Sequence, residues 1–144
     1  MKVLLQRVSS AAVDVAGQRI SEIGPGLLVF VGVAPDDGAQ QVHWLADKIL
    51  GLRIFPEGDK AMNRSVIDVG GELLVVSQFT LTADTSRGKR PGFSTAAPPA
   101  VAERLYNDLV QALQQAAPVK TGRFGADMQV SLVNDGPVTF VLER

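Results

Sequence analysis

Two short polar segments contain the residues whose types and spacing could do chemistry. Residues 77–81 read Ser-Gln-Phe-Thr-Leu and follow directly on the apolar run 73–76. Residues 134–139 read Asn-Asp-Gly-Pro-Val-Thr and lead into the apolar run 138–142. Polar atoms and rigid backbone at the ends of strands are a common way for small β-rich proteins to form pockets. We therefore take these two segments as the candidate site.

The first segment offers two hydroxyl groups, those of Ser77 and Thr80, with Gln78 and Phe79 between them. On an extended chain Ser77 and Phe79 face one way, and Gln78 and Thr80 the other. Neither hydroxyl has an obvious base to activate it. The pattern also fits a strand end whose hydroxyls only satisfy turn hydrogen bonds. If the segment is an active site, backbone amides and groups of the substrate must carry the chemistry, because amide donors alone can hold an oxyanion.

The second segment is defined by Gly136 and Pro137, and a charged residue near the start of the chain belongs with it. A proline that enters an edge strand after a turn is a common structural arrangement. The alternative is that the pair fixes two carbonyl oxygens in a set direction. Arg7 is expected on the same strand face as Val3 and Leu5, so it must lie at an edge, be paired, or bond to carbonyls.

Histidine, thiol and metal chemistry find little support in the sequence. Cysteine is absent, which removes thiol nucleophiles, disulfides and thiolate metal sites together. The single histidine, His43, falls beside the apolar stripe of an expected helix, and no G-x-S-x-G motif accompanies it. Asp36 and Asp37 are better explained as a helix cap than as metal ligands. We predict no metal site and no cofactor.

The composition predicts one domain spanning residues 1–144, because 46 % hydrophobic residues are enough for a single core. A net charge of −1 gives no global basic field, although contact with one small piece of RNA remains compatible with it. The basic stretch 87–90 is a candidate for phosphate contact, and a solvated loop is its more frequent explanation. A charge after only three apolar residues argues against a signal peptide, and no apolar run reaches roughly 20 residues. We expect a soluble, cytoplasmic protein that does not enter a membrane.

Two helices and about seven strands predict an α+β fold with a largely antiparallel, barrel-like sheet. The first helix is expected to start at residues 35–37, with Asp36 or Asp37 as its N-cap, and the second helix at Pro98-Pro99. A hairpin is expected across Gly70-Gly71. The extended segments are expected at residues 3–15, 18–23, 27–33, 65–69, 72–81, 128–133 and 138–142.

Read together, segments 77–81 and 134–139 closely resemble the two signature motifs of the D-aminoacyl-tRNA deacylases. The similarity runs over the whole chain. It includes the opening residues 1–8, the turn at 24–27, the loop at 87–93 and the chain length.

The resemblance implies a homodimeric, barrel-like α+β enzyme that hydrolyses the ester joining a D-amino acid to the 3′-terminal adenosine of tRNA. Gly136 and Pro137 would form a cis peptide that reaches into the partner subunit's pocket, holds the substrate's amino group and leaves no room for an L side chain. Glycine, having no side chain, could pass this filter. Arg7 would brace the Gly-Pro segment.

In the same resemblance Ser77, Gln78, Phe79 and Thr80 would line the pocket around the adenosine and the scissile carbonyl. The terminal 2′-hydroxyl of the tRNA would assist water, while amides near Phe79 and Thr80 stabilise the oxyanion. Two other readings stay open. One is a small-ester hydrolase that uses Thr80 or Ser77 covalently; the other is a dimeric RNA-end binder without turnover.

Overall fold

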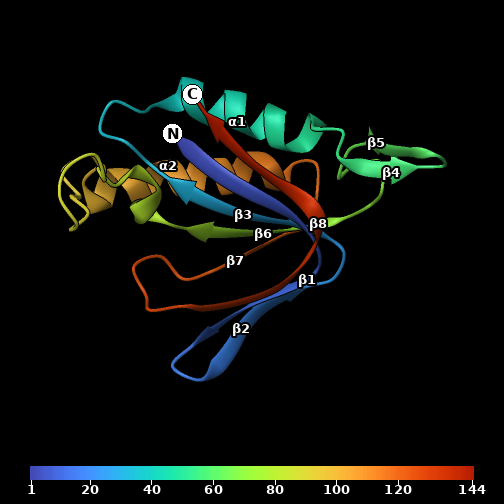
Figure 1. Cartoon of the computed structure of the whole chain (residues 1–144), viewed down its shortest axis with the longest axis horizontal. Coiled ribbons are helices and arrows are strands. Elements are labelled where there is room, and N and C mark those ends of the chain that lie inside the picture. Colours follow the sequence, from blue (N-terminus) through green and yellow to red (C-terminus); the bar gives the residue numbers. More distant parts are fainter.

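The computed structural model describes residues 1–144 and is organised around one six-stranded mixed sheet with both main helices on one side of it (Figure 1). The strands β4 and β5 form a separate two-stranded sheet that projects from the body. The elements in chain order are β1 (Lys2–Val15), β2 (Gln18–Ile23), β3 (Gly26–Gly32), α1 (Ala39–Gly51), β4 (Phe55–Glu57), β5 (Lys60–Arg64), β6 (Glu72–Ser77), the 3₁₀-helix η1 (Phe79–Thr82), α2 (Pro99–Gln114), β7 (Val119–Thr121) and β8 (Gln129–Glu143).

Strand β1 organises the sheet. Its first half pairs antiparallel with β3 and its second half with β2, while β8 runs antiparallel along nearly its whole length. Strands β3, β6 and β7 pair in parallel. The expected α+β class, the barrel-like and largely antiparallel sheet and the two helices are confirmed, and the parallel pairs β3–β6 and β6–β7 make the sheet mixed. No helix is long and apolar enough to cross a membrane.

The central strands β3 and β6 are buried on both faces, because the sheet separates a large core from a smaller one. Leu27, Val29 and Val31 of β3 pack with the buried faces of α1 and α2, whereas Leu28 points into the smaller core on the other side. In β1 the change of core falls near residues 6–10, where bulges interrupt its pairing with β8. Bulges bend a strand and increase its twist. The far halves of β1 and β8 therefore curl over the second face and give the sheet its barrel-like form (Figure 1).

The hairpin expected across Gly70-Gly71 is wrong. Residues 66–70 form a turn closed by Ser65 and Asp68, whose side chains each bond the other residue's amide at 3.1 and 2.8 Å. Such local side-chain bonds compete with strand pairing. Strand β6 instead pairs in parallel with β3, as suits a continuous apolar run buried on both faces. It ends at Ser77, so the expected strand to residue 81 is also wrong.

Two other element boundaries differ from expectation. Helix α1 begins at Ala39 after the N-cap Gly38, because the Asp37 carboxylate accepts a hydrogen bond from the Ala34 amide at 2.6 Å and closes the preceding turn. The second helix begins at Pro99, as expected. The two C-terminal strands are one strand, β8, since its pairing with β1 resumes on both sides of residues 135–138.

Candidate active site

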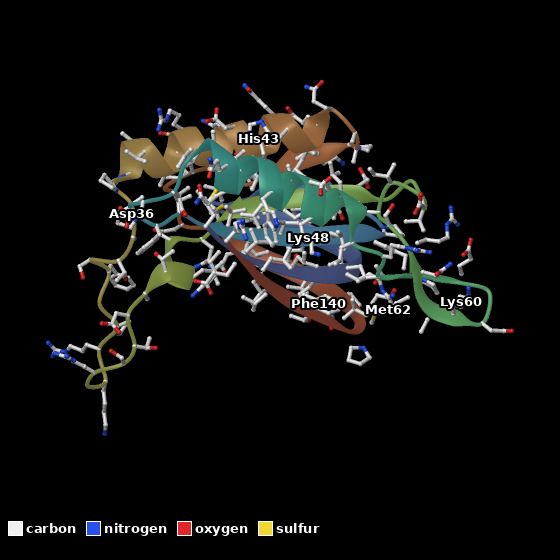
Figure 2. The ribbon with its side chains drawn as sticks, turned by 90° about the horizontal axis from the view of Figure 1, so that it is seen from above. Asp36, His43, Lys48, Lys60, Met62 and Phe140 are labelled. Carbon is white, nitrogen blue, oxygen red and sulfur yellow. The ribbon has the colours of Figure 1, made fainter.

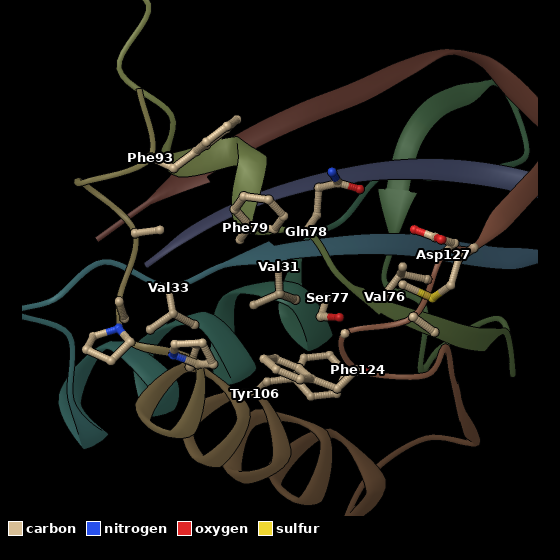
Figure 3. Close-up of a pocket in the computed structure, with 18 of the residues that line it drawn as sticks. Val31, Val33, Val76, Ser77, Gln78, Phe79, Phe93, Tyr106, Phe124 and Asp127 are labelled. Carbon is tan, nitrogen blue, oxygen red and sulfur yellow. The ribbon is translucent and has the colours of Figure 1, made fainter. Parts of the chain in front are cut away.

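A cavity of about 730 Å³ opens at the end of the sheet where β3 and β6 end (Figure 3). Of its 19 lining residues 13 are hydrophobic, and the lining comes from the ends of β3 and β6, from η1, from the loop before α2, from α2 and from the segment that leads into β8. This volume and this mostly apolar lining are typical of sites for small molecules. The cavity is large enough for a nucleoside-sized group.

The first candidate segment forms part of the cavity wall. The Gln78 amide continues the strand pairing for one residue by donating to the Val31 carbonyl at 2.7 Å. The chain then turns into η1, where the Leu81 amide bonds the Gln78 carbonyl at 3.1 Å. The structure thus places Ser77, Gln78 and Phe79 side by side along the cavity (Figure 3).

Thr80 is the member of this segment that does not line the cavity. Its side chain is exposed, and its hydroxyl oxygen accepts a hydrogen bond from the Gln78 side-chain amide. An amide donor cannot take a proton from a hydroxyl, so this contact does not activate Thr80 as a nucleophile.

The backbone at the start of η1 offers donors near the cavity. Phe79 and Thr80 are the first two residues of this 3₁₀-helix. The opening amides of a helix have no carbonyl partner within it. Amides in such a position can bind an oxyanion without help from a charged side chain.

Two aromatic rings mark the mouth of the cavity. Phe79 and Phe93 meet edge to face with ring centroids 5.1 Å apart, and they remain 56 % and 45 % exposed. Both line the cavity. Exposed rings at the rim of an apolar cavity are suited to contact a flat ligand or a second protein chain.

Sequence reasoning missed the opposite wall. The hydroxyl of Tyr106 on α2 donates to the Val75 carbonyl at 2.8 Å, and the centre of its ring lies 6.1 Å from that of Phe124. Burial raises the pKa of Tyr106 above its ordinary value. Asp127 supplies the only carboxylate that lines the cavity. No local signal marks either residue, since only the packing of α2 and the segment before β8 brings them here.

The second candidate segment is held by a network on β8, and its Gly136–Pro137 peptide bond is cis. The Asn134 side-chain amide donates to the carbonyls of Arg7 and Val138 at 2.9 and 3.2 Å. These two bonds join Asn134 to the neighbouring strand β1 and to the residue that follows the Gly-Pro pair. They fix the backbone on both sides of the Gly-Pro pair.

Arg7 completes this network from β1, and only 9 % of the residue is exposed. Its Nε donates to the Asp135 carbonyl at 3.1 Å and pairs with the Asp135 carboxylate at 2.9 Å. A second guanidinium nitrogen bonds the Ile54 carbonyl, and the group lies 5.9 Å from the centre of the Phe55 ring. The paired and bonded charge expected in the first strand is confirmed.

The two candidate segments do not meet within one chain. Strand register puts Ser77 level with Val31 and Val3, whereas the Gly-Pro segment lies beside Arg7. The offset from Val3 to Arg7 is about 13 Å along the strands, and β6 and β8 are three strand spacings of about 4.8 Å apart in the sheet. Neither Gly136 nor Pro137 lines the cavity.

His43 takes no part in either segment. It is exposed on α1, and its Nδ1 lies 2.7 Å from the Ala39 carbonyl oxygen, one helical turn away. No group of three or more His, Asp or Glu side chains lies close enough to hold a metal ion.

Comparison with known proteins gives one consistent family. The family model for D-Tyr-tRNA(Tyr) deacylase matches residues 4–143. A D-aminoacyl-tRNA deacylase of Prosthecochloris aestuarii is 52 % identical over 99 % of both chains, and one of Pseudomonas aeruginosa is 56 % identical over 99 % of both. The solved structure of a c-Myc DNA Unwinding Element Binding Protein superposes with a TM-score of 0.95 at 40 % identity, covering 100 % of this chain and 99 % of that one.

Proposed function

The chain belongs to the D-Tyr-tRNA(Tyr) deacylase family, and we propose that it hydrolyses the ester bond of D-aminoacyl-tRNA to release the free D-amino acid and tRNA. It is a hydrolase, and in this role it removes D-amino acids from tRNA before translation uses them. The substrate is a product of tRNA charging, so the proposal places the enzyme in the cytoplasm.

The observation that carries this proposal is the cavity beside Ser77, Gln78 and Phe79. Its mostly apolar wall suits the base of the 3′-terminal adenosine, and the polar segment at its edge suits the ribose and the ester. Ester hydrolysis needs a polarised carbonyl and a water molecule that is activated or well placed. Donors beside the cavity can polarise the carbonyl. No histidine or lysine lines the cavity, so neither of these side chains can activate the water molecule.

We assign the oxyanion to the backbone amides of Phe79 and Thr80. Removing one such donor typically costs about 100- to 1000-fold in rate, so two amides can supply much of the catalysis. The tRNA's terminal 2′-hydroxyl, adjacent to the ester, then orients the attacking water. This assignment fits a site in which the Thr80 hydroxyl has an amide donor as its only contact.

We assign chiral selection to Gly136 and Pro137 of a second copy of the chain. A single chain keeps this segment away from its own cavity, so it reaches an ester only across an interface. Strand β8 pairs only with β1, and Val133 and Val141 on it are 58 % and 60 % exposed. Exposed apolar residues on a strand with one unpaired edge favour association with another copy. A rigid carbonyl pair would hold the amino group and exclude an L side chain, whereas glycine would pass.

The two other readings are less consistent with the geometry. Covalent catalysis by Thr80 lacks a base and places the nucleophile outside the cavity lining. The RNA-end binder would leave the donors of η1 without a role. It predicts equal affinity for D- and L-aminoacylated ends and no loss of ester.

The proposal is tested with purified protein, EDTA, D-tyrosyl-tRNA and L-tyrosyl-tRNA. We expect rapid loss of the D ester alone, unaffected by EDTA. Loss of neither ester would reject the deacylase and leave the RNA-end binder.

The cross-subunit assignment is tested by mixing Phe79→Ala and Gly136→Ala, two variants that each alter one of the two segments and whose activities are first measured separately. After subunit exchange, half of the dimers hold one copy of each and contain one intact site, so about a quarter of the wild-type activity should return. A mixture no more active than the two variants measured separately would place both segments in the same subunit's site.

A further inference from the structure

The loop between η1 and α2 is attached to the cavity mouth at its base and free at its tip. Asp84 and Gly92 exchange two backbone hydrogen bonds of 2.9 Å, which close the loop. The Thr95 hydroxyl donates to the Thr82 carbonyl, and the Phe93 ring packs on Phe79. Beyond these contacts the loop extends past the end of the sheet (Figure 1). Its base is therefore held against Phe79 and Thr82 at the cavity, and its tip reaches outward.

The tip holds three cations, Arg87, Lys89 and Arg90, and all three are exposed. None takes part in any of the six ion pairs or donates a side-chain hydrogen bond. Asp84, in the same loop, accepts instead from the Ser86 amide at 2.9 Å. Without these three cations the chain has 11 Lys and Arg residues and 15 Asp and Glu residues, which gives the rest of the protein a net charge of −4. The tip is therefore a local positive site on an acidic protein.

The charges around the cavity favour one direction for an RNA strand that leaves it. Phe93 and Asp127 lie at opposite ends of the cavity (Figure 3). The Asp127 carboxylate repels phosphate, while the chain on the Phe93 side leads directly to the basic tip. The cavity lining has no cation for the phosphates that precede a terminal adenosine.

We propose that residues 87–90 bind backbone phosphates of the tRNA acceptor end, next to the terminal adenosine. The inference rests on the proposed function, which places that adenosine in the cavity. Arginine and lysine contacts to phosphate position an RNA without reading its sequence, so the loop sets affinity for any charged tRNA. It also explains how a protein of net charge −1 holds a polyanion: the grip is confined to the acceptor end.

The test compares Arg87→Gln/Arg90→Gln with the matched control Lys48→Gln/Arg104→Gln. The control removes the same charge from exposed positions on α1 and α2, and Lys48 lies on the helix away from the loop (Figure 2). Binding of a fluorescent minihelix with a single-stranded CCA end is measured between 50 and 200 mM KCl. Loss of two phosphate contacts to single-stranded RNA lowers the magnitude of the slope of log K (the association constant) against log salt by about 1.4. Between 50 and 200 mM KCl the loss of affinity is then about sevenfold smaller than in the control.

Turnover separates this inference from the function on which it rests. We expect kcat/KM of the loop variant to fall more for D-tyrosyl-tRNA than for D-tyrosyl-adenosine, which has no phosphate. Equal binding slopes in the loop variant and the control would overturn the inference, even if the wild type hydrolyses both substrates. Hydrolysis of neither substrate by the wild type would reject the proposed function, and the minihelix slopes would still decide whether the loop binds RNA.

Discussion

Gly136→Ala is the substitution for which the structure gives the clearest consequence. A Cβ at Gly136 would lie 2.6 Å from the Asn134 side-chain oxygen and 3.4 Å from its Cγ. The next heavy atom, the Val138 nitrogen, is 3.7 Å away, an ordinary contact. The Asn134 side chain must therefore move, and it gives up its bonds to the Arg7 and Val138 carbonyls.

The cost follows from these two bonds. Each contributes about 1 kcal/mol, so Gly136→Ala should lower the free energy of unfolding by about 2 kcal/mol, or Tm by roughly 5–10 °C. Asn134→Ala loses the same bonds without a clash and should cost about as much. Because Asn134→Ala also removes the atom that clashes, the double variant should be no less stable than Asn134→Ala alone. The double-mutant cycle then shows a coupling of about 2 kcal/mol.

Urea unfolding of the four proteins at one protein concentration measures this cycle, and kcat/KM for D-tyrosyl-tRNA measures its effect on activity. If the Gly136 carbonyl holds the substrate's ammonium group, losing that bond should lower kcat/KM by about 10- to 100-fold. In the matched control Gly92→Ala the new Cβ lies 3.8 Å from its nearest neighbour, so Tm should stay unchanged. Combined with Asn134→Ala, it should show no coupling energy. Additive destabilisation in the double variant would refute the clash with Asn134, and full activity of Gly136→Ala would refute the role of its carbonyl.

Three further predictions follow from the cavity. Thr80→Ala should keep kcat for D-tyrosyl-tRNA within about tenfold in single-turnover assays, whereas a loss of about 10⁴-fold would make Thr80 the nucleophile. Tyr106 is the only tyrosine and burial raises its pKa, so ultraviolet titration of the folded protein should show no phenolate near pH 10. The contribution of the neutral phenol to the free energy of unfolding is complete below about pH 10 and falls above it, and Tyr106→Phe should lack this fall. Phe93→Ala removes the edge-to-face partner of Phe79 and should raise KM by about 2- to 10-fold, with Phe93→Leu intermediate; equal KM values would show that Phe93 does not position Phe79.

The sequence predicted the parts of the fold whose signal is local. The continuous apolar run of β3 and the proline at the start of α2 are recognisable without any neighbour, and both were placed correctly. The hairpin at Gly70-Gly71 failed for a physical reason. Two glycines between apolar runs indicate a tight turn, but they do not say whether the next strand returns beside its predecessor or crosses to a distant one. Parallel pairing of β6 with β3 depends on α1 and the two-stranded sheet between them, which is long-range information.

The candidate site divides in the same way. Ser77, Gln78 and Phe79 were found because a polar segment follows a buried strand. Tyr106 and Asp127 were not, since each looks ordinary in its own element and reaches the cavity only through packing. A buried hydroxyl needs a partner, but no local pattern names the Val75 carbonyl as that partner.

The separation of the two motifs within one chain constrains any mechanism that uses both. Strand positions in a sheet are fixed by hydrogen-bonded register, and a slip by one residue would turn every buried side chain to the opposite face. A slip of about four residues along β1 would bring Gly136 only level with Ser77, still three strand spacings away, and the packing of both cores forbids even that slip. If both motifs act on one ester, the second must come from another copy. The network of Arg7, Asn134 and Asp135 then has a consequence beyond stability, because it holds the backbone on both sides of the Gly-Pro pair in one position.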